Sequence, residues 1–420
     1  MADIIAPQPV EDDFIALGDN FSEPTSPPSR STPPSSRSLP WPTAPPPWVR
    51  GRDYTTAGEV ATFLHREIKD FVSYVSPTPE QARSRARAVA RVQTCVHGLW
   101  PEATVCVFGS YATSLYLPLS DIDIVIVSED GRHADRASLF RLANALKAQQ
   151  VAASGSVEVV ARARVPIVKY VDRVSGIAID VSFERYGGVL AADTVLHWVA
   201  NTPGLRELVL VVKTLLAQRE LSNVANGGLG GYAAVCLVRS FLQMHPAVQS
   251  GRIRADENLG VLLLQFFDLY GRHFSYDDVG LSLTRGGKYF SRRPQKRGRD
   301  SGSGNGAPPV NYSGGGALYI EDPNDPTNNI SRGTYNLRNV RRAFAGAHEI
   351  LAQQCYELDA VSRREWRART VLGALLRAPA GVEESEEEDD VKEICRPASR
   401  ASSKGSAKAK SIASSGGGEA

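Results

Sequence analysis

The sequence contains few cysteines and no long apolar run. Its 420 residues include five scattered cysteines, with no CxxC pair and no histidine at the spacing of a zinc finger. We therefore predict reduced cysteines and no zinc site. No apolar run approaches the roughly 20 residues that span a bilayer, and the first residues lack the basic and then apolar order of a secretory signal. These absences predict a soluble, intracellular protein with no membrane attachment.

A large excess of charge of one sign is also absent. Lys and Arg number 48 and Asp and Glu number 46, which gives a net charge of +2. Any binding of nucleic acid must therefore depend on local patches. Residues 292–299 carry five Arg or Lys and run into a Gly/Ser/Pro stretch. We predict a mobile basic loop over 291–316, which either adds weak phosphate contacts or is a solvated or nuclear-import segment.

The order of apolar patterns divides the chain into two folded domains between two tails. Residues 1–52 are rich in Pro and Ser, and residues 379–420 are acidic and then rich in Lys and Ser, so both tails are predicted to be disordered. Residues 53–190 combine leading helices with β-prone runs and predict a small mixed sheet. Residues 191–378 show mainly helical spacing. The predicted fold class is α+β, with a sheet domain followed by a mainly α-helical one.

Periodicity also predicts the individual elements. Strands are expected at 105–108, 122–127, 157–161, 166–171 and 177–183. Helices are expected at 57–74, 79–99, 137–149, 194–200, 205–219, 232–244, 259–270 and 339–376.

The most informative motif is Asp121-Ile122-Asp123 on a strongly β-prone run, preceded by Gly109-Ser110. In a strand alternate side chains share a face, so Asp121 and Asp123 would point together. Two like charges repel unless a cation lies between them, and Mg²⁺ takes one or two carboxylates together with substrate phosphates. Gly109 lets backbone N–H groups approach a phosphate, and Ser110 adds a hydroxyl donor. The motif predicts a metal-dependent nucleoside-triphosphate site; the alternative is a solvated strand face.

A third carboxylate has the same character. Asp180 lies in the middle of the apolar run 176–183, where an unpaired buried charge would cost several kcal/mol. With Asp121 and Asp123 it would complete a two-metal site, in which two ions bind the attacking and leaving oxygens of an in-line displacement. An exposed strand position is the alternative.

These motifs resemble those of the DNA polymerase β-like nucleotidyltransferases, and the second domain resembles the PAP-associated domain of template-independent poly(A) polymerases. A narrower resemblance is to the nuclear poly(A) polymerases of the TRAMP complex. It covers about residues 57–376. It is carried by the segments 111–127, 208–213, 227–232, 241–246, 262–274 and 319–335.

The resemblance implies an enzyme that adds AMP from ATP to RNA 3′ ends with two Mg²⁺ or Mn²⁺ ions, and so marks nuclear RNAs for exosome decay. Asp121 and Asp123 would hold both metals, and Asp180 would bind the catalytic metal and help to activate the RNA 3′-hydroxyl. The resemblance also implies a set of residues that contact the nucleotide: Gly109, Ser110, Gly188, Lys213, Gly231, Tyr232, Asn328 and Arg332.

Within this set, Lys213 would contact phosphates and Tyr232 would stack on the base. Gly188 would lie beside the nucleotide. Asn328 and Arg332 fall on the loop that reads the base. From the residues alone, Lys213 is equally a lysine on an apolar helix, Tyr232 a core residue, and Asn328 and Arg332 turn residues.

The chain departs from the pattern of the family at two positions. Gly231 stands where the family commonly has a serine that faces the triphosphate. The base-reading loop commonly runs Asn-Asp, whereas this chain has Asn328-Asn329.

The sequence leaves two other functions open. A terminal uridylyltransferase uses the same triad, but the family's uracil-selecting enzymes usually carry a histidine in the base-reading loop, and residues 328–335 contain none. A catalytically inactive RNA-binding scaffold would lack one of the three carboxylates, all of which are present. No KH or RNP motif is found, so the resemblance implies a separate zinc-knuckle RNA-binding subunit together with an RNA helicase. It also implies the nucleus, including the nucleolus, as the location.

Overall fold

The computed structural model describes residues 45–129, 131, 133, 135–163, 165–292 and 318–382. Most of the two predicted tails and nearly all of the predicted basic loop lie outside these ranges. The predicted α+β class is confirmed. In the described part of the chain, no helix has both the length and the apolar character needed to cross a membrane, and the four cysteines found there form no disulfide.

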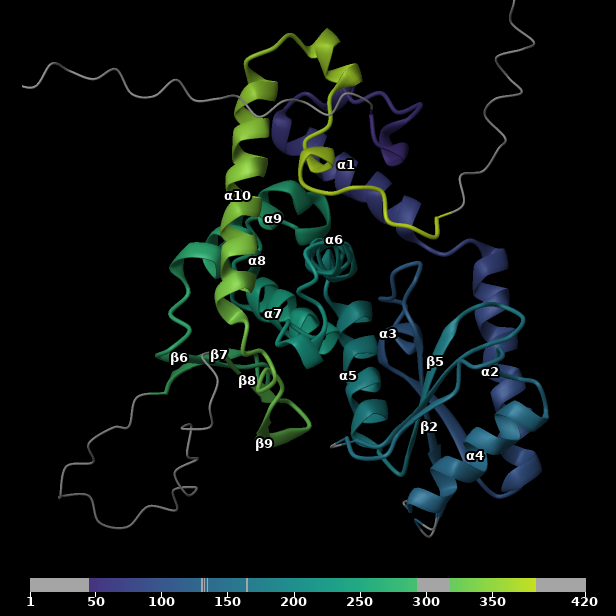
Figure 1. Cartoon of the computed structure of the whole chain (residues 1–420). Helices are drawn as coiled ribbons and strands as arrows, with labels where there is room; N and C mark the ends of the chain where they lie inside the picture. The colour runs from purple at the N-terminus through teal and green to yellow at the C-terminus, as the bar shows by residue number, and fades with distance from the viewer. Residues whose placement is uncertain are drawn as a thin grey trace, which may run out of the picture. The chain divides into compact units, whose positions relative to one another are not determined.

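A five-stranded mixed sheet forms one half of the described region. Its strands are β1 (Thr104–Phe108), β2 (Ile122–Val127), β3 (Glu158–Val160), β4 (Ile167–Val171) and β5 (Ala178–Phe183), in the order β1-β2-β5-β4-β3. β2 and β5 are parallel, whereas the other neighbours are antiparallel. Two helices, α2 (Pro79–Leu99) and α4 (Arg136–Ala148), cover one face (Figure 1). The apolar side chains of β2 and β5 that alternate toward these helices are fully buried.

One register row of the sheet carries three charged side chains and the ring of Phe108 on the face opposite to the one that α2 and α4 cover. Asp123 pairs with Asp180 across β2 and β5, Asp180 pairs with Lys169 of β4, and Asp123 pairs with Phe108 at the end of β1. Because the side-chain period of a strand is two, this row points away from the face on which Ile124 is buried. We call Phe108, Asp123, Asp180 and Lys169 the carboxylate row.

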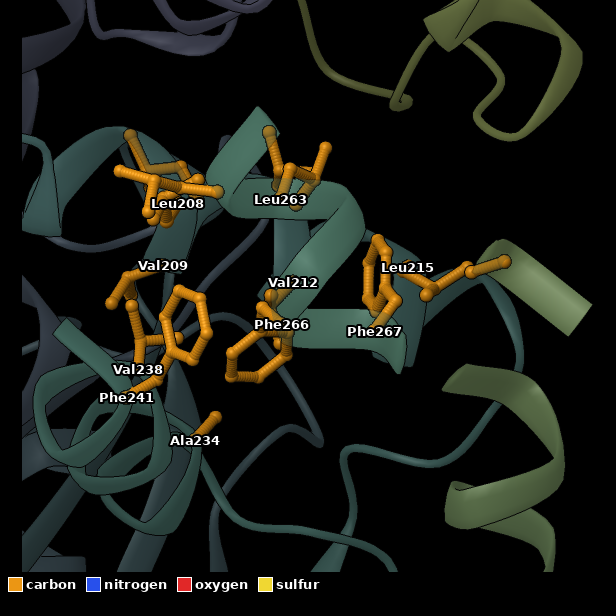
Figure 2. Packing of buried hydrophobic residues seen from close by; sticks show 14 of the residues in the cluster. Leu208, Val209, Val212, Leu215, Ala234, Val238, Phe241, Leu263, Phe266 and Phe267 are labelled. Carbon is orange, nitrogen blue, oxygen red and sulfur yellow. The ribbon is translucent and has the colours of Figure 1, made fainter. Parts of the chain in front are cut away.

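The other half is mainly helical. Its helices are α1 (Val60–Val75), α5 (Gly187–Asn201), α6 (Leu205–Gln218), α7 (Gly231–Met244), α8 (Pro246–Gln249), α9 (Leu259–Asp268) and α10 (Leu337–Asp359), and a π-helical turn, Leu269–His273, follows α9. Figure 2 shows the centre of its core, where Val209 and Val212 of α6 and Phe241 of α7 meet Phe266 of α9. The rings of Phe241 and Phe266 meet edge to face with centroids 5.6 Å apart, a favoured aromatic geometry.

A second, four-stranded sheet stands beside these helices. Its strands are β6 (Val279–Ser282), β7 (Lys288–Ser291), β8 (Tyr319–Asp322) and β9 (Asp325–Asn329), in the order β7-β6-β8-β9. This sheet was not predicted from the sequence. β9 contains only Asp, Pro, Thr and Asn, which are mostly depleted in strands, so its pairing with β8 could not be read from propensity.

Three predicted boundaries are wrong. Residues 45–52 were assigned to the disordered N-terminal tail, but Trp48 is buried, with its ring centroid 5.1 Å from that of Phe71. α1 was assigned to the sheet domain, but its buried face belongs to the helical core. The last helix was predicted to reach residue 376, but α10 ends at Asp359, because Ser362 and Glu365 form a capping box that starts a new 3₁₀ turn.

Glu67 of α1 joins the two ends of the described region. Its carboxylate is fully buried and accepts hydrogen bonds from Trp48 Nε1 at 3.3 Å, from the Thr370 hydroxyl, and from the backbone N–H groups of Val371 at 2.8 Å and Leu372 at 3.0 Å. Burial raises the pKa of Glu67, and the four donors oppose that rise. The segments before α1 and after α10 are therefore held by one carboxyl group.

Candidate active site

The carboxylate row lines a pocket of about 840 Å³. Its walls come from both halves of the described region, with the sheet on one side and α5, α6 and the start of α7 on the other. The pocket brings together most of the predicted site residues: Gly109, Ser110, Asp121, Asp123, Asp180, Gly188, Lys213, Gly231 and Tyr232.

The three aspartates place an excess of negative charge in this pocket. Burial raises the pKa of Asp123 to about 7, and the charges of Asp121 and Asp180 add to the rise. Burial also raises the pKa of Asp121, with Asp180 as the next cause. A nearby cation lowers the free energy of ionised carboxylates that are both desolvated and mutually repelling. The electrostatics of the pocket therefore favour a bound positive charge.

Lys169 provides one such charge and was not singled out from the sequence. Its Nζ lies 2.5 Å from Asp180 Oδ2. Burial opposes the charged form of Lys169, but the hydrogen bond and the charge of Asp180 outweigh it and raise the lysine pKa. The signal that could have found it was a lone charge inside the apolar strand β4, the same signal that pointed to Asp180.

Gly109 is required by its close approach to Asp123. Its φ of +67° lies in the left-handed region, and a Cβ at this position would stand 2.0 Å from Asp123 Oδ2. Gly109 and Ser110 follow directly after β1 and begin the short helix α3 (Gly109–Ala112). The Gly-Ser turn is therefore packed directly against a carboxylate of the row.

Lys213 and Gly231 lie together on the wall opposite the sheet. Lys213 Nζ donates a hydrogen bond to the Leu115 carbonyl oxygen at 2.5 Å. Burial lowers the pKa of Lys213 to about 8, and the charges of Asp121 and Asp123 oppose this fall. A Cβ on Gly231 would stand 3.7 Å from Lys213 Cε and 3.8 Å from Nζ, which is ordinary van der Waals contact.

Gly188 and Tyr232 complete the pocket from α5 and α7. A Cβ on Gly188 would meet the ring of Phe108 at 2.6 Å, so close packing against β1 already explains a glycine at this position. Tyr232 is partly buried, and burial raises its pKa. Within the described ranges, the buried Tyr232 hydroxyl has no hydrogen-bond partner, so this residue of the pocket lining keeps one unsatisfied polar atom.

The structure does not bring Asn328 and Arg332 into the pocket lining. Asn328 lies on β9, and its Nδ2 donates to Asp322 Oδ2 at 2.9 Å, whereas Arg332 is exposed in the turn that follows β9. The same turn is attached to the segment that leads into α7, because the Tyr335 hydroxyl donates to the Ala225 carbonyl at 2.9 Å. The turn that carries Arg332 is therefore joined, through Tyr335, to the segment that leads into α7 and Tyr232.

The side chain of Asn329 links the end of β9 to the start of β8 and to the turn that follows β9. Its Oδ1 accepts from the N–H groups of Ile320 at 3.1 Å and Ser331 at 3.0 Å, and its Nδ2 donates to the Leu318 carbonyl at 3.2 Å. An ionised aspartate can accept but cannot donate. The amide at 329 thus has a structural explanation.

The comparisons with known proteins agree with this geometry. Residues 64–200 match the family model of the central palm domain of mitochondrial-like poly(A) RNA polymerase, and residues 258–328 match that of Cid1 family poly A polymerase. Poly(A) RNA polymerase protein 2 of Saccharomyces cerevisiae is 44% identical over 331 residues, which are 79% of this chain and 54% of that protein. The polymerase core of TRAMP, described as an RNA surveillance complex, superposes with a TM-score of 0.69 at 43% identity and is covered over 99% of its chain.

The chain belongs to the family of poly(A) RNA polymerases that includes the TRAMP polymerase core. It spans about half the length of the first curated poly(A) polymerases that it matches. The relatives include an inactive protein: a Drosophila melanogaster protein described as an inactive non-canonical poly(A) RNA polymerase is 37% identical over 69% of this chain and 68% of its own length. Membership therefore indicates a nucleotide substrate and a divalent metal in general. Activity depends on the side chains that this chain carries in the pocket.

The donor set of this poly(A) RNA polymerase family member fits a hard divalent ion. Mg²⁺ takes one or two carboxylates and fills its other positions with water and substrate phosphates, and Asp121 and Asp123 supply such carboxylates. In the part of the chain that the structure describes, no three His, Cys, Asp or Glu side chains form a ready ligand set. Asp180 is instead bonded to Lys169, so it would join a metal only after exchanging that contact.

Proposed function

We propose that this chain is a template-independent poly(A) RNA polymerase that adds AMP from ATP to RNA 3′ ends by a two-metal mechanism with Mg²⁺ or Mn²⁺. The observation that supports this most directly is the arrangement of one pocket. The three aspartates lie on the sheet side, while Lys213 and Tyr232 lie on the helical side. Such a pocket can hold the ions against the phosphates of a nucleotide whose base lies on an aromatic ring.

In the proposed reaction the RNA 3′-oxygen forms a bond to the α-phosphorus of ATP, the bond from that phosphorus to pyrophosphate breaks, and the hydroxyl proton passes to water. Bound divalent ions would stabilise charge on the attacking and leaving oxygens. Asp121, Asp123 and Asp180 would hold them. Lys213, a cation on the helical wall, would contact the triphosphate.

The remaining contacts follow the geometry of the pocket. Gly109 and Ser110 would meet the triphosphate from the end of β1, and Gly188 would lie beside the nucleotide. Asn328 would approach the base from β9, and Arg332 would approach it from the turn that follows β9. Neither lines the pocket here, so their contact with a base would need the β8–β9 hairpin to move toward it.

The wider role is also a proposal. We infer that the chain acts in the nucleus, including the nucleolus, on RNAs that are then degraded by the exosome. Its RNA selection would come from a zinc-knuckle RNA-binding subunit and an RNA helicase, because the sequence contains no RNA-recognition module of its own. The TRAMP polymerase core that it resembles supports a role within such a complex.

Two other functions are less well supported. A uridylyltransferase would use the same carboxylates, but position 328 and the residues that follow it to 335 include no histidine. A catalytically inactive scaffold, as its Drosophila relative is described, would not need all three aspartates, and this chain keeps them.

Primer extension tests the proposal. The purified chain is incubated with a labelled oligo(A) primer, Mg²⁺ or Mn²⁺, and each ribonucleotide separately. We expect extension with ATP well above that with UTP, GTP or CTP. Preferred extension with UTP would favour the uridylyltransferase, and no extension with any nucleotide, alone or with an added RNA-binding subunit, would favour the scaffold.

Substitution of Gly231 by Ser should strengthen ATP binding. The new side chain has room beside Lys213, and its hydroxyl would add a hydrogen bond to the triphosphate. We expect a roughly 3- to 10-fold lower KM for ATP, or about 0.7–1.4 kcal/mol, with little change in kcat because the contact is made equally in the ground and transition states.

Gly231→Ala is the matched control, because it adds the Cβ without the hydroxyl and should leave KM unchanged. Gly230, not Gly231, caps α7, so neither variant should gain stability from capping. A Gly231→Ser protein with unchanged or weaker ATP binding would show that position 231 does not face the phosphates.

A further inference from the structure

Arg85 is a buried cation on the inward face of α2. Only 4% of its surface is exposed, whereas Arg83 and Arg87 on the same helix are exposed. Within the described ranges, it donates hydrogen bonds to two backbone carbonyls and to no carboxylate. A buried charge without an ion pair is costly, so this arginine needs an explanation beyond the stability of the helix.

Its guanidinium clamps the segment that precedes Asp121. Nη1 donates to the Ser120 carbonyl and Nη2 donates to the Pro118 carbonyl, each at 2.8 Å. The same guanidinium lies 4.5 Å from the centroid of the Tyr116 ring. The planar fork of arginine fixes two acceptors in one orientation, which a lysine cannot do.

The clamped segment is short and leads directly to the site. Ser120 is the residue before Asp121, and β2 begins at Ile122. Lys213 holds the same segment further back, at the Leu115 carbonyl. Asp121 lies outside the strand, so its position depends on these carbonyl contacts. Asp123 depends on them less, because pairing with both neighbouring strands, β1 and β5, fixes its backbone.

We propose that Arg85 is a positioning residue that holds Asp121 in place for metal binding. This inference rests on the proposed function, because it assigns Asp121 to a metal. Residues that orient metal ligands without touching the metal typically change metal affinity or activity by about 10- to 100-fold when they are replaced.

The test compares Arg85→Met and Arg85→Lys with a matched control on the same helix. Arg91 also makes a two-pronged contact, to the buried Asp172 at 2.8 and 2.5 Å, but this contact does not involve the segment that precedes Asp121. Arg91→Met should therefore destabilise the same domain without affecting Asp121. Mn²⁺ binding is measured by electron paramagnetic resonance without nucleotide, and the melting temperature of every variant is measured in parallel.

We expect Arg85→Met to weaken Mn²⁺ binding at least about 10-fold and Arg85→Lys to weaken it less, because lysine keeps the charge and only part of the clamp. In primer extension the half-saturating Mg²⁺ concentration should rise by a similar factor. Arg91→Met should stay within about twofold of the wild type in both measurements, whatever its melting temperature.

The inference is wrong if Arg85→Met binds Mn²⁺ like the wild type, or if Arg91→Met loses affinity equally. Should Arg85→Met fail to fold, Arg85→Lys decides, and Mn²⁺ binding equal to that of the wild type then rejects the proposal. A wild-type chain that binds Mn²⁺ but extends no RNA would reject the proposed function and leave the role of Arg85 to be judged from Mn²⁺ binding.

Discussion

Replacing Asp123 by Asn should abolish RNA extension, with kcat/KM falling at least about a thousandfold, or about 4 kcal/mol of transition-state stabilisation. Asparagine keeps the shape of the side chain in the carboxylate row but removes the charge that a metal ion needs. The measurement is primer extension with saturating Mg²⁺. Asp193→Asn, an exposed aspartate of α5 outside the pocket lining, is the control and should keep full activity.

The same variant should be more stable than the wild type without metal. The pKa of Asp123 rises from 3.8 to about 7 in the folded chain. The free energy of unfolding of the wild type therefore falls as the pH rises through this range, and the loss is complete above about pH 7. In EDTA we expect Asp123→Asn to gain on the order of 2–4 kcal/mol at pH 8 and nothing near pH 4. Melting temperatures at several pH values measure this.

Added metal should reverse the gain. Mg²⁺ binds the folded wild type and stabilises it by mass action, so the melting temperatures should converge at high Mg²⁺. An Asp123→Asn protein with full activity would remove the basis for the two-metal proposal. One that is inactive but no more stable in EDTA would show that burial and the neighbouring aspartates do not destabilise the ionised Asp123 in the folded chain.

Replacing Glu67 by Leu should cost about 3–5 kcal/mol of stability. The substitution leaves four buried donors without an acceptor, and each such donor costs about 1–3 kcal/mol unless the segments rearrange. For a folded region of this size, we expect the melting temperature to fall by roughly 10 °C. Thermal unfolding followed by circular dichroism measures this change.

Two controls separate this effect from others. Glu67→Gln keeps one acceptor oxygen for the N–H groups of Val371 and Leu372 and should lose less than half as much. Asp70→Asn, on the same helix but partly exposed beside Tyr54, should cost about 1 kcal/mol or less. Because Glu67 does not line the pocket, extension well below the melting temperature should continue in Glu67→Leu. An unchanged melting temperature would mean that the two chain segments are held by other contacts.

The sheet that bears the site could be predicted because its pattern is local. The alternation in β2 and the lone charge in β5 each follow the two-residue period of a strand, and together they placed Asp121, Asp123 and Asp180 at one site. The pairing of Asp123 with Asp180 bears out that expectation. Their roles in metal binding stay a prediction.

What the sequence could not provide was the partner of each element. The amphipathic spacing of α1 predicted a helix, but nothing local says that its buried face packs against α9 and α10, which begin only at Leu259 and Leu337. The β8–β9 hairpin is specified by side-chain bonds such as those of Asn329, and not by β-propensity. The burial of Arg85 could not be predicted for the same reason, because it depends on contact with the segment at Ser120, 35 residues later.

The carboxylate row also limits how this protein can evolve. Phe108, Asp123, Asp180 and Lys169 share one register, so inserting or deleting a residue within β2 would turn Ile124 toward the pocket and an aspartate toward the helices that cover the sheet. Such a change would destroy the fold together with the chemistry. A lineage that keeps this fold and loses the reaction must therefore do so by exchanging single side chains, and most lengthening or shortening of the chain is confined to the connections between strands.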